Sequence, residues 1–136
     1  MRKFAVLFVT ILLLVSCQST PITGETVTVD GGSYQNITAA ELKSMLKDKD
    51  FLLVNVHIPT GGSILGTDLF IPYNEITVSE NVLQLPAEKD SKIVLYCRSG
   101  RMSEIAAQEL VNLGYTNVWN VWGGMLDWEK AGHPLE

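Results

Sequence analysis

The residues best suited to chemistry lie together in one short segment, CRSGRMS, at residues 97–103. It opens with a cysteine, whose thiolate is a nucleophile. Two arginines, Arg98 and Arg101, supply positive charge that can hold an incoming oxyanion. Gly100 can adopt backbone angles that other residues avoid, so that successive N–H groups can turn inward as an anion nest. The segment therefore predicts a site that stabilises a thiolate and binds a small anion.

We expect Cys97 to be the catalytic residue and the rest of the segment to be the substrate-binding loop, formed by Arg98, Ser99, Gly100, Arg101, Met102 and Ser103. The alternative is a buried and inert cysteine at the end of a strand, which is how most free cysteines behave. An inert cysteine needs neither arginines nor a glycine beside it. The composition of the segment therefore favours a functional thiol.

The elements on either side would place this loop at the edge of a sheet. Residues 92–96, KIVLY, read as a buried strand that leads directly into Cys97. Residues 103–113 carry apolar side chains at helical spacing, and Gly114 is placed to end that helix. A loop between the carboxyl end of a strand and the amino end of a helix is where open α/β sheets bind anions.

The remaining elements alternate in the same way. Strands are expected at residues 51–56 and 118–121, and helices at residues 39–47 and 125–131. This order predicts an α/β fold with a central, mostly parallel sheet and helices on both faces. Residues 81–85 fit either one helical turn or a short strand.

The start of the chain reads as an export and anchoring signal. Residues 1–16 have the charged start and apolar run of a signal peptide, and the run would span only about 18 Å as a helix, short of a ~30 Å membrane core. The stretch ending in Cys17 resembles the lipobox of bacterial lipoproteins, which implies lipidation of Cys17 and attachment to a membrane. An ordinary secretory peptide with a chance cysteine is the alternative. Residues 17–32 then form a tether with only a short alternating stretch, 26–29, that suggests a strand, and residues 33–136 form the folded domain.

Charge and composition exclude several other classes. The chain has 10 Lys and Arg against 15 Asp and Glu, a net charge of −5, which argues against a nucleic-acid partner. Two cysteines and two histidines do not make a convincing zinc site, so we expect no metal and no cofactor. With Cys17 acylated, Cys97 has no partner for an intramolecular disulfide.

Three segments together resemble the rhodanese family of sulfurtransferases. CRSGRMS resembles that family's active-site loop, VWNVWGGMLDWEKAGHP at residues 118–134 is similar to its closing segment, and YQNITAAELKSML resembles its opening segment. The resemblance covers roughly residues 33–136. It implies a rhodanese-like fold and a Cys97 persulfide that takes sulfane sulfur from a small anion such as thiosulfate and passes it to an external thiol or to cyanide.

The resemblance weakens between residues 52 and 75. The chain has Asn55-Val56-His57 where rhodaneses usually have Asp-Val-Arg, so a salt-bridging pair is missing. An imidazole titrates near neutrality, so His57 is a candidate acid or base. We favour the alternative that His57 orders the loop beside the site. His133 is expected to be a solvated surface residue.

Three tryptophans, Trp119, Trp122 and Trp128, are expected to pack in the core.

Two competing functions stay open. One is a phosphatase or arsenate reductase of the Cdc25-related kind. Those enzymes hold phosphate with an arginine six residues after the cysteine, and the serine at that position here, Ser103, argues against this function. The other is a non-catalytic, lipid-tethered module that binds a partner or senses sulfur. For the protein in either case, we expect a lipid-anchored location in a bacterial cell envelope, on the outer membrane facing the periplasm if the organism is Gram-negative.

Overall fold

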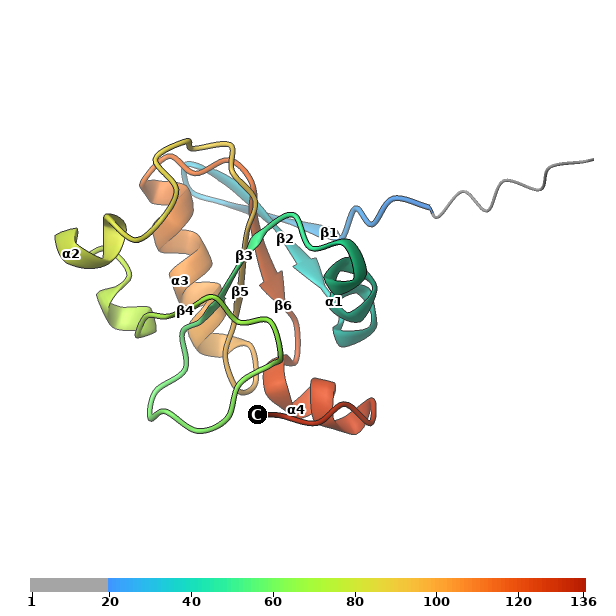
Figure 1. The fold of residues 1–136 in the computed structure, drawn as a ribbon. Helices are drawn as coiled ribbons and strands as arrows, with labels where there is room; N and C mark the ends of the chain where they lie inside the picture. The colour runs from blue at the N-terminus through green and yellow to red at the C-terminus, as the bar shows by residue number, and fades with distance from the viewer. Residues whose placement is uncertain (1–19) are drawn as a thin grey trace, which may run out of the picture.

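The computed structural model describes residues 20–136, so the expected signal peptide and Cys17 lie outside the described residues. One six-stranded sheet runs through the domain in the order β1-β2-β6-β5-β3-β4 (Figure 1). Only β1 and β2 are antiparallel, and the other neighbours are parallel. The strands are β1 (Glu25–Val29), β2 (Gly32–Ile37), β3 (Leu52–Asn55), β4 (Leu69–Phe70), β5 (Ile93–Tyr96) and β6 (Val118–Val121).

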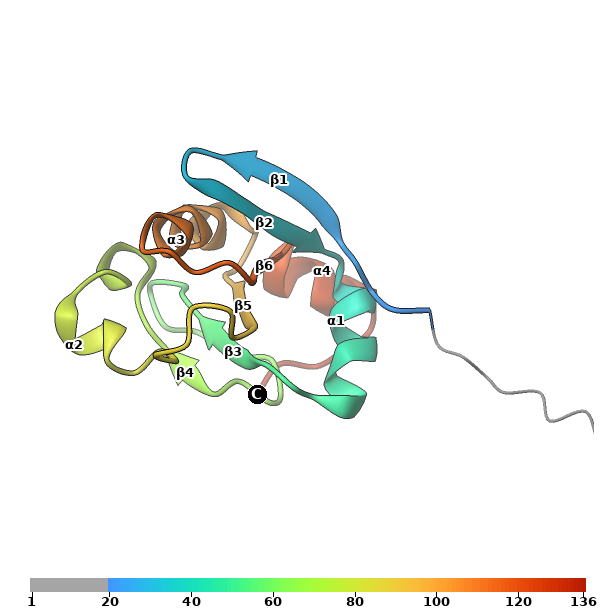
Figure 2. The ribbon, with the colours of Figure 1, turned by 90° about the horizontal axis from the view of Figure 1, so that it is seen from above.

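Helices cover both faces of this sheet, as Figure 2 shows with α3 on one side and α1 and α4 on the other. The helices are α1 (Ala39–Met45), α2 (Ser79–Val82), α3 (Arg101–Asn112) and α4 (Gly124–Lys130), with single 3-10 turns at Leu46–Asp48 and Tyr73–Glu75. The predicted α/β architecture with a mostly parallel central sheet is therefore confirmed. Residues 81–85, which fitted two alternatives, overlap the short helix α2.

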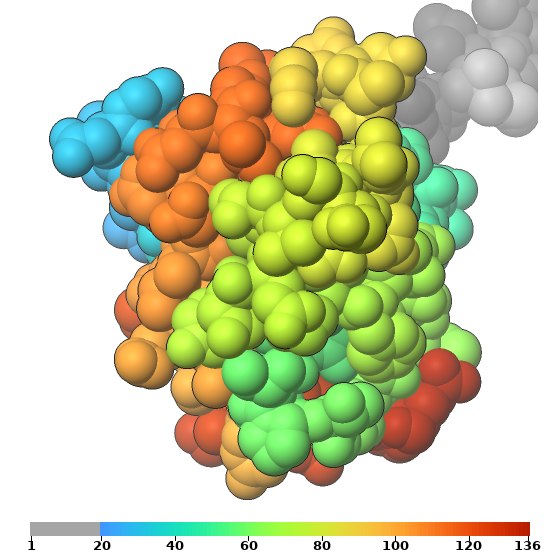
Figure 3. Space-filling model, turned by 90° about the vertical axis from the view of Figure 1, so that its left-hand side faces the viewer, coloured from blue at the N-terminus to red at the C-terminus, as the bar shows by residue number. Residues whose placement is uncertain are grey.

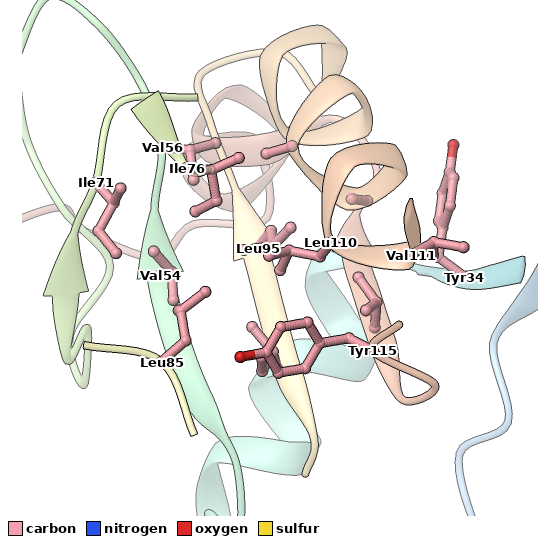
Figure 4. Packing of buried hydrophobic residues seen from close by; sticks show 14 of the residues in the cluster. Tyr34, Val54, Val56, Ile71, Ile76, Leu85, Leu95, Leu110, Val111 and Tyr115 are labelled. Carbon is pink, nitrogen blue, oxygen red and sulfur yellow. The ribbon is translucent and has the colours of Figure 1, made fainter. Parts of the chain in front are cut away.

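The two faces have separate hydrophobic cores that meet at the central strand β5. Leu95 and Leu110 belong to the core on the α3 side (Figure 4), whereas Val94 and Trp128 belong to the core on the α1 and α4 side. All four residues of β5 are buried. A strand buried on both faces reads as a continuous apolar run, which is why the sequence predicted β5 correctly.

The folded region starts before residue 33. Residues 25–29, which the sequence places in the tether, form β1 and pair with β2. Val27 and Val29 pack against the core on the α3 side, and Gly31 turns the hairpin at a φ of +85°. The alternation of residues 26–29 was therefore a real strand signal, and the tether is shorter than expected.

Two expectations about aromatic residues need correction. Trp122 follows β6 and is 56% exposed, so it is not a core residue like Trp119 and Trp128. His133 is not simply solvated, because its ring lies 4.6 Å from the Trp128 ring. Each ring's position depends on tertiary neighbours that its local sequence does not reveal.

Within residues 20–136, the helices are all too short or too polar to cross a membrane.

A long connection between β3 and β4 is anchored by the buried side chain of Tyr96. The Tyr96 hydroxyl accepts a hydrogen bond from the Ile64 N–H at 3.0 Å and lies 2.6 Å from Thr67 Oγ1. Thr67 Oγ1 in turn donates to the Ile64 carbonyl, so Tyr96 donates to Thr67. Figure 3 shows the chain from this connection to the start of β5 (green to yellow) spread over one side of the molecule. Tyr96, the residue before Cys97, therefore fixes the position of this connection.

We predict that Tyr96→Phe destabilises the domain by about 1–3 kcal/mol, because it leaves the buried Ile64 N–H without its partner. Tyr115→Phe is the comparison, since it removes one partly buried hydrogen bond, to the Pro86 carbonyl, and should cost less. Urea unfolding of both variants measures the difference. A loss for Tyr96→Phe no larger than that for Tyr115→Phe would contradict this account.

Candidate active site

The loop that carries Cys97 is very short. β5 ends at Tyr96 and α3 begins at Arg101, so only residues 97–100 lie between the strand and the helix. The sequence placed the start of this helix at residue 103, two residues too late. Cys97 is 1% exposed. Its position at the carboxyl edge of the sheet, below the amino end of α3, is the one predicted from the sequence.

The sulfur of Cys97 lies among hydrogen-bond donors. The Gly100 N–H donates to Cys97 Sγ at 3.0 Å, and Ser103 Oγ lies 3.4 Å from the same sulfur. Ser103 is fully buried and also donates to the Gly100 carbonyl at 3.0 Å. One hydroxyl proton cannot serve both acceptors at once, so it can turn towards the sulfur when negative charge develops there. This arrangement stabilises an anion on the sulfur.

The backbone carbonyls of the loop are held by the last helix. The Met125 N–H donates to the Cys97 carbonyl and the Leu126 N–H donates to the Arg98 carbonyl, both at 3.0 Å. Gly100 adopts a φ of +108° at the end of the loop. With these carbonyls bonded to α4, the N–H groups are the backbone groups left to face an anion.

Gly124 allows α4 to approach the loop this closely. A Cβ at residue 124 would lie 2.3 Å from the Cys97 carbonyl oxygen, and the residue has a φ of +53°. In the sequence, the double glycine was recognised only as part of the closing segment at residues 118–134. Its role in supporting the site was missed, although a glycine pair directly before a helix is a signal for close backbone approach.

The predicted loop residues divide into three groups. Gly100 and Ser103 contact the sulfur. Arg98, Ser99 and Arg101 are exposed, and neither arginine forms an ion pair within residues 20–136. The side chain of Met102 packs against the hydrophobic core, so it is not directed to a substrate. The arginines therefore remain available to an anion at the surface.

Asn55 orders the neighbouring loop, a role that the sequence gave to His57. The Asn55 amide donates to the Gly62 carbonyl at 3.2 Å, and its Oδ1 accepts from the His57 N–H at 3.0 Å. The ring of His57 takes no part, because its Nδ1 is buried without a hydrogen-bond partner among the described residues. Burial lowers the pKa of the His57 imidazole, and the positive charge of Arg98 lowers it further.

No group of three or more potential metal ligands occurs within the part of the chain that the structure describes.

A family profile described as the rhodanese-like domain matches residues 38–131. The chain belongs to this family. A sulfurtransferase from Allochromatium vinosum is 31% identical over 102 residues, which cover 73% of this chain and 92% of that protein. A tRNA uridine(34) hydroxylase from Escherichia coli is 30% identical over 103 residues, but the match spans only 29% of the hydroxylase.

Solved structures of rhodanese-like proteins share this fold. A rhodanese-related protein from Thermoplasma volcanium superposes with a TM-score of 0.62 at 29% identity, covering 76% of this chain and 98% of the other. A rhodanese-like domain from Anabaena sp. gives a TM-score of 0.64 at 25% identity, covering 74% and 77%. The rhodanese-like fold expected from the three resembling segments is therefore confirmed.

We predict that Gly124→Ala damages the site more than the same change at Gly132. Both glycines have positive φ, so each alanine carries backbone strain of about 1–2 kcal/mol, but only residue 124 meets the loop, since no atom lies within 4 Å of a Cβ at residue 132. Urea unfolding should show a clearly larger loss for Gly124→Ala. Equal losses would mean that the approach of α4 to the Cys97 carbonyl does not matter.

Proposed function

We propose that this protein is a sulfurtransferase that carries sulfur as a persulfide on Cys97. The observation that supports it most directly is the pair of donors around Cys97 Sγ, the Gly100 N–H and the Ser103 hydroxyl. Such donors stabilise the thiolate that must attack and the negative charge of the persulfide that forms. The membership of the family and the sulfurtransferase relative support the same reaction class.

The first half-reaction loads the sulfur. The Cys97 thiolate attacks the sulfane sulfur of a small anion such as thiosulfate and forms a new S–S bond. The bond between the two sulfur atoms of thiosulfate breaks, and sulfite leaves with its electron pair. Arg98 in the loop and Arg101 at the start of α3 are both exposed, so their charge can hold the donor anion.

The second half-reaction transfers the sulfur from Cys97 to an acceptor. An external thiolate attacks the outer sulfur of the persulfide, and the bond from that sulfur to Cys97 Sγ breaks. Cys97 returns as a thiolate and the acceptor leaves as a persulfide. Cyanide would accept the sulfur in the same way and leave as thiocyanate.

A phosphatase is the less favoured enzyme because of Ser103. The position where Cdc25-related enzymes hold phosphate with an arginine carries a serine that is fully buried and bonded to the Gly100 carbonyl. The remaining alternative is a non-catalytic binding or sulfur-sensing module. A module that only binds a partner would need neither a nucleophile nor donors aimed at its sulfur.

We predict that thiosulfate adds one sulfur atom to Cys97 and that Cys97→Ser abolishes both this gain and turnover, because the serine cannot form the S–S bond. Intact-protein and peptide mass spectrometry measure the gain, and thiocyanate or sulfite release measures turnover. Arg101→Lys keeps the charge and should still load sulfur. An unchanged thiol after treatment would favour the binding module, and an active serine variant would place the chemistry elsewhere.

We further propose that the protein is lipidated on Cys17 and held at a membrane of a bacterial cell envelope. The supporting observations are those of the sequence, namely the charged start, the apolar run and a cysteine at its end. The described chain begins only a few residues after Cys17, and residues 20–24 precede the first strand. In a Gram-negative organism the domain would face the periplasm from the outer membrane.

We predict that Cys17→Ala, expressed with the leader present, abolishes fatty-acid labelling and membrane recovery, because several acyl chains on one residue provide the anchor. The folded domain starts later in the chain, so its urea unfolding should not change. Equal incorporation of labelled fatty acid by the variant would disprove lipidation at this residue.

A further inference from the structure

His57 lies at the same edge of the sheet as Cys97. β3 and β5 are parallel neighbours in which Asn55 pairs with Tyr96, and the Val56 N–H continues the ladder by donating to the Tyr96 carbonyl at 2.9 Å. His57 follows Val56 and Arg98 follows Cys97, so the two residues continue these neighbouring chains beyond the ends of β3 and β5, and the charge of the Arg98 guanidinium acts on the imidazole. The imidazole therefore lies near the Arg98 end of the Cys97 loop.

Hydrogen bonds from the His57 ring do not order the connection after β3 among the described residues. Asn55 makes both hydrogen bonds that order this part of the connection, one of them to the backbone of His57 itself. The buried Nδ1 makes none. A buried polar atom without a partner costs free energy, and such atoms in native proteins need a separate explanation.

The charge state of the ring suits a proton acceptor. Burial lowers the pKa of His57 and the Arg98 guanidinium lowers it further, so the neutral form prevails at pH 7. Arg98 is the charged side chain that acts on the ring from the neighbouring loop. In the tautomer that carries its proton on Nδ1, the imidazole has a lone pair on Nε2 that can accept a proton.

The second half-reaction requires such an acceptor. An ordinary thiol has a pKa of about 8.5, so most of it is protonated at pH 7, whereas only the thiolate attacks. We propose that His57 is the general base that removes the proton of the acceptor thiol, an inference that rests on the proposed sulfurtransferase function. The acceptor is thus a protonated thiol rather than an anion that is already reactive.

The acceptor S–H proton moves to His57 Nε2 and the S–H electron pair stays on the acceptor sulfur. That sulfur bonds to the outer sulfur of the persulfide, and the bond to Cys97 Sγ breaks with its pair on Cys97. The imidazolium then returns its proton to solvent. Nothing is oxidised or reduced beyond the transfer of one sulfur atom.

The test uses two acceptors on protein already loaded with sulfur. Wild type, His57→Gln and His57→Asn are treated with thiosulfate, the persulfide is quantified by mass, and single-turnover transfer is followed at pH 8 to 2-mercaptoethanol, which is mostly protonated, or to sulfite, which is mostly the proton-free dianion. At this pH we expect transfer to the thiol to fall by about 10²-fold in both variants, the size of a typical general-base contribution. Transfer to sulfite should stay unchanged, and the thiol deficit should shrink as the pH rises towards the pKa of the acceptor thiol, where solvent supplies the thiolate.

The other outcomes separate the two proposals. Equal losses with both acceptors would show that His57 only supports the loop, and no loss with the thiol would show that no base is needed. Either result overturns the proposal for His57 and leaves sulfur loading intact. Wild-type protein that gains no sulfur would overturn both proposals. Thr60→Ala, an exposed change in the same connection, controls for disturbance of this segment and should transfer sulfur normally.

Discussion

Two hydrogen bonds from the first turn of α4 to the carbonyls of Cys97 and Arg98 hold the site together. The loop itself is too short to have a core, so its shape comes from the elements around it. α3 packs on one face of the sheet and α4 on the other, and the loop joins both. The donors around the sulfur are therefore in place only when both cores have formed and the end of the chain is folded.

The second support of the site is a neutral network in place of an ion pair. Asn55 is 4% exposed and bonds at both ends of its amide, to the Gly62 carbonyl and to the His57 N–H. Burial of a neutral amide with its partners costs less than burial of a charge. Losing the usual salt-bridging pair therefore does not leave this connection loose, because the amide of Asn55 and the hydroxyl of Tyr96 order it from two sides.

The sequence predicted those parts whose signal is local. The apolar run of β5, the glycine after Cys97 and the helical spacing of α3 were enough to place Cys97 at a sheet edge. The missed features depend on neighbours far along the chain. That β1 belongs to the folded domain and not to the tether shows only when it pairs with β2, and the need for Gly124 arises from the Cys97 carbonyl. The same holds for His57, since only the folded structure shows that Asn55 makes the hydrogen bonds of this connection and that Nδ1 of the His57 ring makes none.

The nature of the donors argues for the kind of anion that the loop holds. Ser103 is fully buried, so a cation at this position would carry a heavy desolvation cost unless a multiply charged ligand always faced it. A persulfide has a single negative charge on one atom, which a backbone N–H and a hydroxyl can stabilise without a buried counter-charge. The two arginines lie outside in solvent, where their attraction for a donor anion is real but screened by salt. Charged side chains at the surface and neutral hydrogen-bond donors around the sulfur suit a donor anion that binds, transfers one sulfur atom to Cys97 and dissociates.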